Sequence, residues 1–396
     1  MTVDSHPSTH PLLPPTTEDD RASWLRLLRS RRVGPATFYR LMAEHGSAPA
    51  ALDALPAIAR NAGVKDYHPS TDAAARAEMD AAKKAGARMI CLPDPDYPIA
   101  LRGISDPPPL LWAVGEAEIC PRPAIALVGA RNASSLGTRM ARALSAELGE
   151  AGKVIVSGLA RGIDTAAHLA ALENGTVAVM AGGVDVLYPA ENARLANDIC
   201  DRGGLRISEQ PMGLTPQARH FPRRNRIISG MALAVVVVEA AAKSGSLITA
   251  RTALDQGREV LAVPGHPFDA RAAGCNMLIR DGALLVRSAN DVLETLETAA
   301  PRDHATKAPC DSGAIPQRPA CPAPPQANAP PETRSLRETA ELHRRILDRL
   351  GPSPLAEDQL IRDLSASAHR VAPALLELEL EGRVHRQPGG LLSRSK

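Results

Sequence analysis

The sequence predicts an α/β protein whose central domain is a doubly wound parallel sheet, with a small helical domain before it and a second small domain after it. Two observations support this prediction. Between residues 85 and 298, short apolar segments alternate with longer helical patterns, which indicates strands joined by crossover helices. The apolar segments are continuous runs rather than alternating ones, as is typical of strands buried on both faces.

The individual elements of this region follow from the same patterns. Apolar runs predict strands at Ile125–Val128, Val154–Val156, Thr176–Met180, Leu205–Ile207, Leu233–Val238, Glu259–Val263 and Ala283–Val286. Helical patterns between them predict helices at Ser135–Glu150, Thr165–Glu173, Asn192–Cys200, Arg226–Met231, Leu247–Gln256 and Cys275–Arg280. Ligands of such sheets bind at the carboxyl ends of the strands, so the loops that follow the strands are the candidates for a site.

Four segments flank the sheet. Residues 1–20, rich in Pro, Thr and Ser, are expected to form a disordered tail. Residues 21–84 predict a helical domain, in which a Gly-Pro pair between amphipathic stretches is typical of a helix-hairpin-helix; such hairpins contact DNA in some proteins and only pack in others. Residues 299–334 are proline-rich and predict a linker. Residues 335–396 show three helices and a hairpin, which is the plan of a winged helix.

Composition excludes several classes of protein. The 396 residues carry a formal net charge of +2, so a nucleic-acid site would need local clustering of cations. No CxxC pair occurs among the cysteines, which disfavours structural zinc and a redox centre. The longest apolar run, Met231–Val238, is too short to span a bilayer, and the first residues lack a signal-peptide pattern. We expect a cytoplasmic protein without membrane contact.

The loops after the first two predicted strands lack the features of a dinucleotide site. In Gly129-Ala130-Arg131, the arginine stands where the GxGxxG pattern needs its second glycine. The second loop, Ser157-Gly158-Leu159-Ala160-Arg161, offers no terminal acid for a ribose hydroxyl. These differences disfavour a dehydrogenase. The glycines, the helix N-termini and the two arginines favour anion binding instead.

The strongest cluster of charge follows the fourth strand. Arg219, Arg223, Arg224 and Arg226 fall in a stretch without acids and surround Phe221. Guanidinium groups for phosphates and a ring for a base are what a single strand requires, although the same stretch could be a solvated basic loop. After the fifth strand, residues 243–246 (Lys-Ser-Gly-Ser) form a candidate anion nest that lacks the ATP-site pattern.

Asp164 and His168 lie four residues apart near the start of a helix and could share one face. They could form a catalytic acid–base pair. Alternatively, Asp164 could accept hydrogen bonds from first-turn amides while His168 packs or bonds structurally. No nucleophile or third metal ligand accompanies them in the sequence, which favours the structural interpretation.

Taken in order, the motifs of the central region resemble the DNA-processing protein A (DprA/Smf) family. The resemblance covers about residues 90–290, and its pieces are Tyr97-Pro98, Asp106–Pro108, Gly129–Arg131, Ser157–Asp164 with His168, Gly183–Pro189, Phe221–Gly230, Glu239-Ala240, Ser244–Ala250, Val263–Gly265 and Gly274–Asn276. Each piece alone is weak, whereas the ordered series is specific.

This resemblance implies a Rossmann-like central domain, a sterile-alpha-motif-like (SAM-like) domain before it and a winged helix after it. It implies a protein of natural transformation that binds single-stranded DNA, protects the incoming strand and helps load a RecA-type recombinase. It also implies a homodimer formed through the Rossmann-like domain, no cofactor, no metal and no enzymatic activity. Together with the loops, it indicates these DNA-binding residues: Gly129, Arg131, Ser157, Gly158, Arg161, Phe221, Arg223, Arg224, Asn225, Arg226, Lys243, Ser244 and Gly245.

Two other functions stay open. A nucleotide-processing enzyme, which would hydrolyse N-glycosidic or phosphate bonds, could place Asp164, His168, Asp185 and Glu209 in one crevice, but no coherent nucleophile or base can be assigned. A regulator of duplex DNA could act through the winged helix. The third helix of that domain, however, carries three glutamates near its end, which suit a phosphate backbone poorly. We expect the domain to be an accessory module that is dispensable for strand binding.

Overall fold

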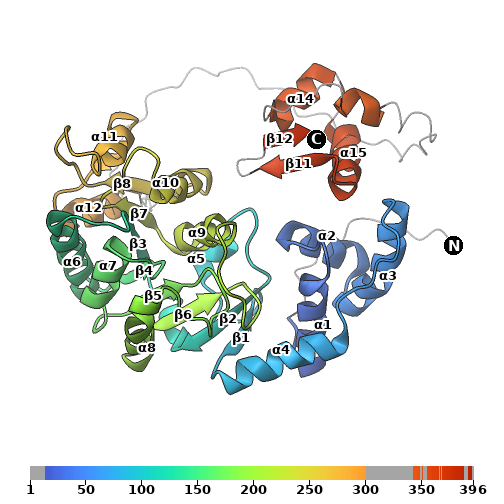
Figure 1. Ribbon diagram of the computed structural model, residues 1–396, viewed down its shortest axis with the longest axis horizontal. Helices are drawn as coiled ribbons and strands as arrows, with labels where there is room; N and C mark the ends of the chain where they lie inside the picture. The colour runs from blue at the N-terminus through green and yellow to red at the C-terminus, as the bar shows by residue number, and fades with distance from the viewer. Residues whose placement is uncertain are drawn as a thin grey trace, which may run out of the picture. The chain divides into compact units, whose positions relative to one another are not determined.

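The computed structural model describes residues 14–299 and, nearer the C-terminus, residues 342–347, 350, 355–364, 366, 368–387 and 391–394 (Figure 1). The chain divides into two compact units, Met1–Thr298 and Ala299–Lys396. The first unit contains the N-terminal helices and the central sheet. Most of the expected tail and the expected linker lie outside the described residues.

Four helices begin the first unit: α1 (Glu18–Arg29), α2 (Pro35–His45), α3 (Ala48–Asn61) and α4 (Asp72–Lys84). The expected tail of residues 1–20 was too long, because α1 already starts at Glu18. A reciprocal capping box between Thr17 and Asp20 satisfies the free amides at that start. The Gly-Pro pair acts as predicted at the hairpin, since Gly34 caps α2 and Pro35 is its first residue.

The central sheet has nine strands in the order β1-β2-β6-β5-β4-β3-β7-β8-β9. Their bounds are β1 (Arg88–Cys91), β2 (Leu110–Gly115), β3 (Ala124–Val128), β4 (Val154–Ser157), β5 (Thr176–Val179), β6 (Leu205–Ser208), β7 (Ala234–Val237), β8 (Glu259–Ala262) and β9 (Leu284–Leu285). All seven predicted strands are present and pair in parallel. The strands β1 and β2 were not predicted, and they add an antiparallel edge beside β6.

The helices of this region are α5 (Ile99–Arg102), α6 (Ser135–Glu150), α7 (Ile163–Ala170), α8 (Ala193–Asp201), α9 (His220–Met231), α10 (Gly245–Asp255), α11 (Ala273–Arg280) and α12 (Ala289–Ala299). They cover both faces of the sheet (Figure 1). The packing of alternate residues of β3 shows which helices lie on each face. Ile125 and Leu127 pack in the cluster that contains α6, α7 and α12. Ala126 and Val128 pack in the opposite cluster, with α5, α9 and α10. Within the described residues no helix is long and apolar enough to cross a membrane.

The second unit has the winged-helix plan that the sequence predicts. Residues 342–347 are helical, and α14 (Glu357–Leu364) and α15 (Ala368–Leu380) follow. A small sheet has the order β10-β12-β11, formed by β10 (Leu355–Ala356), β11 (Val384–Gln387) and β12 (Leu391–Arg394). The helix predicted from Leu355 starts two residues later, because Leu355 and Ala356 pair with the hairpin strand β12.

Candidate nucleic-acid interface

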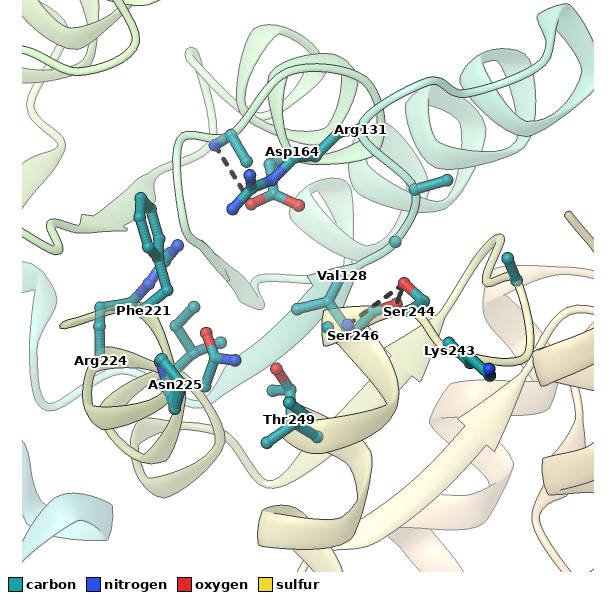
Figure 2. Close-up of a pocket in the computed structure, with 18 of the residues that line it drawn as sticks. Val128, Arg131, Asp164, Phe221, Arg224, Asn225, Lys243, Ser244, Ser246 and Thr249 are labelled. Carbon is teal, nitrogen blue, oxygen red and sulfur yellow. Dashed lines mark hydrogen bonds between the residues drawn. The ribbon is translucent and has the colours of Figure 1, made fainter. Parts of the chain in front are cut away.

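The central domain contains a pocket of about 730 Å³. It lies where the order of the strands reverses: from β3 the chain proceeds through β4, β5 and β6, and then returns to β7 on the other side of β3. The loops after β3 and β7 and the helices α9 and α10 form its walls (Figure 2). This is the position that the topology of an open α/β sheet assigns to a ligand.

An aromatic ring and a cation form one wall of this pocket. The guanidinium carbon of Arg131 lies over the ring of Phe221, 5.0 Å from the ring centroid. Tyr188, 49% exposed, lies beside the same ring with the centroids 6.1 Å apart. Tyr188 and Arg161 line a small adjoining pocket that shares Arg131 and Phe221 with the large one. The site therefore offers a stacking surface with two exposed arginines beside it.

The arginine cluster of residues 219–226 is distributed differently from what we predicted, because α9 starts at His220 and not at Arg226. In a helix, neighbouring side chains point about 100° apart. Arg223 is consequently exposed, and it lines neither pocket. Arg224 and Asn225 line the large pocket. The four arginines therefore do not form one surface.

Arg224 forms the buried floor of the pocket and is only 5% exposed. Its Nη1 donates to the carbonyl of Val179 at 3.2 Å, and it lies against Gly158. A Cβ atom at Gly158 would approach that nitrogen to 1.4 Å, so any side chain there would displace the guanidinium from its place. Burial lowers the pKa of Arg224 to about 10, although Asp164 opposes the shift. Gly158 and Arg224 therefore shape the floor of the pocket, and their contact with DNA stays a prediction.

Two other residues of the predicted set make their contacts within the protein. Arg226 is engaged by carboxylates: it pairs with Glu209 and with Asp106, the latter at 3.2 Å, and its side chain is only 12% exposed. Ser157 is fully buried, and its hydroxyl donates to the carbonyl of Leu127 at 2.6 Å. Neither side chain lines the pocket. Arg226 instead ties α9 to the end of β6 and to the segment before β2.

Asp164 and His168 are held by the fold. Asp164 accepts hydrogen bonds from the amides of Gly158 at 3.1 Å and Ala160 at 3.3 Å, which lie in the preceding loop and not in the first turn of α7. Burial raises the pKa of Asp164, and nearby Arg224 counteracts this. His168 contacts Thr176 with Nδ1 to Oγ1 at 2.7 Å, and burial lowers its pKa to about 3. The predicted structural interpretation therefore accounts for both residues, with a different set of amides.

Two helix N-termini at the pocket differ in what they can bind. The N-terminus of α6 is occupied by the protein itself, since the carboxylate of Glu239 accepts from the amide and the hydroxyl of Ser134. At α10 the expected residues Lys243, Ser244 and Gly245 line the pocket, and Lys243 is exposed. Arg271 joins them, a cation that the sequence reasoning missed. Anions are favoured at this second terminus.

Of the thirteen predicted residues, the structure brings most together. Eight line the large pocket: Gly129, Arg131, Phe221, Arg224, Asn225, Lys243, Ser244 and Gly245. Gly158 and Arg161 line the adjoining one. Ser157, Arg223 and Arg226 line neither. Among the described residues no cluster of His, Cys, Asp or Glu could hold a metal ion.

The fold and the pocket define a class: a doubly wound α/β protein with a basic, aromatic pocket at the switch point and two small flanking domains. Comparison with known families then gives a narrower assignment. The family of DNA recombination-mediator protein A matches residues 88–297, a DprA-like N-terminal HHH domain matches 18–81, and a DprA winged helix domain matches 330–390. The chain belongs to the DNA recombination-mediator protein A (DprA/Smf) family.

Individual relatives agree with this assignment. The chain is 38% identical to Protein Smf of Escherichia coli (strain K12) over 296 residues, which is 74% of each chain. It is 46% identical over 206 residues to the DNA processing protein DprA of Streptococcus pneumoniae (strain ATCC BAA-255 / R6), covering 52% of this chain and 72% of that one. The X-ray structure of DprA from Streptococcus pneumoniae superposes with a TM-score of 0.52 at 42% identity, over 57% of this chain and 77% of that one.

Proposed function

We propose that the chain binds single-stranded DNA in the pocket between α9 and α10. The main supporting observation is that the guanidinium of Arg131 lies over the ring of Phe221 in a pocket that Lys243 and Arg271 also line. A ring gives a base a face to stack on, and the cations can follow the backbone. In duplex DNA the bases are paired and stacked within the helix, so the duplex cannot use this wall.

Membership of a family named for recombination mediation supports a wider role. In this role the protein protects single strands during natural transformation and helps load a RecA-type recombinase onto them. It works as a homodimer through its Rossmann-like domain. Binding rather than hydrolysis is favoured because Asp164 and His168, the best candidates for acid–base catalysis, are buried and hydrogen-bonded within the protein.

The winged helix is best explained as an accessory module. The helix α15 stands where a winged helix has its recognition helix. Its Glu379 pairs with Arg386 at 2.9 Å, and its Glu377 pairs with His343 at 3.0 Å. Acidic groups on this helix repel a phosphate backbone, and the pairs hold them in place. A chain that ends at residue 331 should therefore keep the affinity of the intact protein for single strands.

A salt titration of single-strand and duplex affinity tests the proposal. Four cations are exposed around the two pockets: Arg131, Arg161, Lys243 and Arg271. If each neutralises one phosphate, with Arg161 and Arg271 giving up their surface pairs with Glu191 and Asp269, log K against log salt should have a slope of about −3 for single strands, at about −0.7 per contact. A slope near zero, equal affinity for duplex, or release of a product from DNA or nucleotides would contradict it.

A further inference from the structure

The loop that follows β4 has an unusual backbone. Leu159 in this loop has a φ of 56°, which lies in the left-handed region. A residue with a β-carbon rarely adopts that region, because the side chain crowds the backbone, and the conformation persists only where the surroundings hold it. The side chain of Leu159 is fully buried in a cluster with Met180 and Leu195. The loop then reaches Arg161, a cation of the small pocket, so its conformation bears on the site.

Three polar side chains hold this loop. The carboxylate of Asp164 accepts from two of its amides, and the hydroxyl of Thr165 donates to the carbonyl of Ala160 at 2.8 Å. The third, Asn192, comes from the start of α8. Its Nδ2 donates to the carbonyl of Leu159 at 2.9 Å and to the hydroxyl of Thr165 at 2.9 Å, with the carbonyl of Ala160 at 3.3 Å. A distant segment therefore binds the left-handed residue itself.

Asn192 joins two segments of the small pocket. It is only 5% exposed, and it follows Tyr188 by four residues, while Tyr188 and Arg161 both line that pocket. A buried carboxamide loses its bonds to water, and the contacts with the loop replace them. The side chain of Asn192 lines neither the small pocket nor the large one. Any effect of Asn192 on a bound strand must therefore pass through the loop.

The position of Arg161 depends on the backbone that carries it. Its side chain is 63% exposed, and its ion pair with Glu191 is long, with 3.9 Å between Nη1 and Oε1. Exposed pairs of this kind stabilise little. The backbone of the loop consequently decides where the guanidinium lies. A guanidinium that starts from a displaced loop has to be ordered again before it meets a phosphate, which weakens binding.

We infer that Asn192 is a positioning residue for strand binding: its carboxamide holds the loop in the left-handed conformation, and the loop presents Arg161 to a phosphate. This inference rests on the proposed single-strand function and extends it to a side chain outside both pockets. The loss of Asn192 should then act through Arg161. Such an effect depends on salt, because it removes a phosphate contact, whereas a general loss of stability does not.

A double-mutant cycle in the full chain tests this coupling. Fluorescence anisotropy measures the affinity for a dT oligonucleotide at several salt concentrations, well below the thermal midpoint of each variant. Asn192→Ala and Arg161→Ala should each weaken binding by about threefold to tenfold. Each should also make the slope of log K against log salt shallower by about 0.7. The double variant should bind like Arg161→Ala alone, because both changes remove the same contact.

Asn197→Ala is the matched control on the same helix. The Oδ1 of Asn197 accepts from Nη1 of the buried Arg206 at 2.9 Å, far from the loop in sequence. This variant should have a lower thermal midpoint and an unchanged affinity and salt slope. Thr165→Val gives a second test that does not depend on the folding of Asn192→Ala. It keeps the shape of the side chain, removes one bond to the loop, and should weaken binding only while Arg161 is present.

The outcomes separate this inference from the proposed function. If folded Asn192→Ala and Thr165→Val bind like the natural protein with the same salt slope, strand binding stands and the positioning role is wrong. If the losses from Asn192→Ala and Arg161→Ala multiply in the double variant, Asn192 supports the fold in general and the inference is overturned. If the natural protein binds no single strand, the proposed function fails first and the inference falls with it.

Discussion

The two sides of helix α9 carry the same type of residue for different purposes. On the pocket side, Phe221 is stacked by Arg131 from the loop after β3, and Arg224 closes the floor. On the other side, Arg226 pairs with Glu209 and Asp106, which come from distant parts of the chain. The comparison shows that a basic stretch of sequence is not a basic surface. Carboxylates brought in by the fold neutralise some of its arginines.

The supporting side of α9 also connects to the N-terminal helices. Arg29 of α1 pairs with Glu78 of α4 at 2.9 Å and donates to the carbonyl of Glu209 at 3.3 Å. The indole of Trp112 on β2 donates to the same Glu78 at 2.8 Å. This network continues to Arg226 through Glu209. It fixes the rotation of α9 about its axis, which in turn decides that Phe221 and Asn225 face the pocket.

The largest expected effect comes from breaking this supporting side. Arg226→Ala leaves Glu209 buried without its partner, and the loss of one member of a buried ion pair typically costs about 3–5 kcal/mol. Urea denaturation should show that loss of stability. Arg142→Ala, an exposed arginine on α6, is the matched control and should change the free energy of unfolding by less than about 0.5 kcal/mol. If the Arg226→Ala variant were as stable as the natural protein but bound DNA more weakly, Arg226 would belong to the DNA-binding side of α9 and not to its supporting side.

On the pocket side the effect should fall on binding instead. Phe221→Ala removes the stacking surface and should weaken single-strand binding by about 1–3 kcal/mol. Phe268→Ala is the matched control, because this phenylalanine is 95% exposed and does not line the pocket. Anisotropy titrations of both variants with one oligonucleotide measure the difference. Equal losses in both would show that the pocket has no special role.

Much of this architecture could be predicted from sequence, because continuous apolar runs between helical patterns are a local signal. The seven parallel strands carry that signal. The edge strands β1 and β2 do not, since the connection between them contains only the four-residue helix α5 and so lacks the strand–helix alternation. Tertiary pairing with β6 makes β2 a strand, and that pairing cannot be read locally.

The site was predictable in its location and not in its details. The start of α9 was missed because Pro222 suggests a break, yet proline is tolerated in the first turn of a helix. The orientation of every arginine after it depends on that start. Tyr188 and Arg271 were missed because each stands on a loop without a neighbouring cation motif. Burial of Ser157 and pairing of Arg226 depend on contacts with residues far away in sequence.

The buried His168 predicts that the stability of the protein depends on pH. Burial lowers the pKa of His168 from 6.5 to about 3, so the folded protein keeps this ring neutral where the unfolded chain protonates it. Stability from this group is present above pH 6.5 and is lost as the pH falls toward 3. Between pH 7 and pH 5 the loss is about 2 kcal/mol.

His168→Asn isolates that contribution, because the carboxyl groups whose pKa values are raised by burial, Asp164 and Glu209, are common to both proteins and cancel in the difference. Urea denaturation at the two pH values gives the comparison. The variant should be less stable at pH 7 and should lose less stability on acidification than the natural protein. An identical pH dependence in both proteins would show that His168 is not kept neutral by the fold.

The smallest expected effect concerns Arg223, which belongs to the same cluster of arginines as Arg224 and Arg226. Arg223 is exposed, does not line the pocket and directly precedes the buried Arg224 in the sequence. Arg223→Ala should change the free energy of unfolding by less than about 0.5 kcal/mol, because exposed substitutions away from caps and pairs do little. It should also leave the salt slope unchanged, whereas Arg131→Ala should make it shallower by about 0.7, the value for one lost phosphate contact. Salt titrations of the two variants, run beside the natural protein, show which of the two arginines contacts a phosphate. If Arg223→Ala reduced the slope and Arg131→Ala did not, the strand would follow the outer surface of α9 and not the pocket.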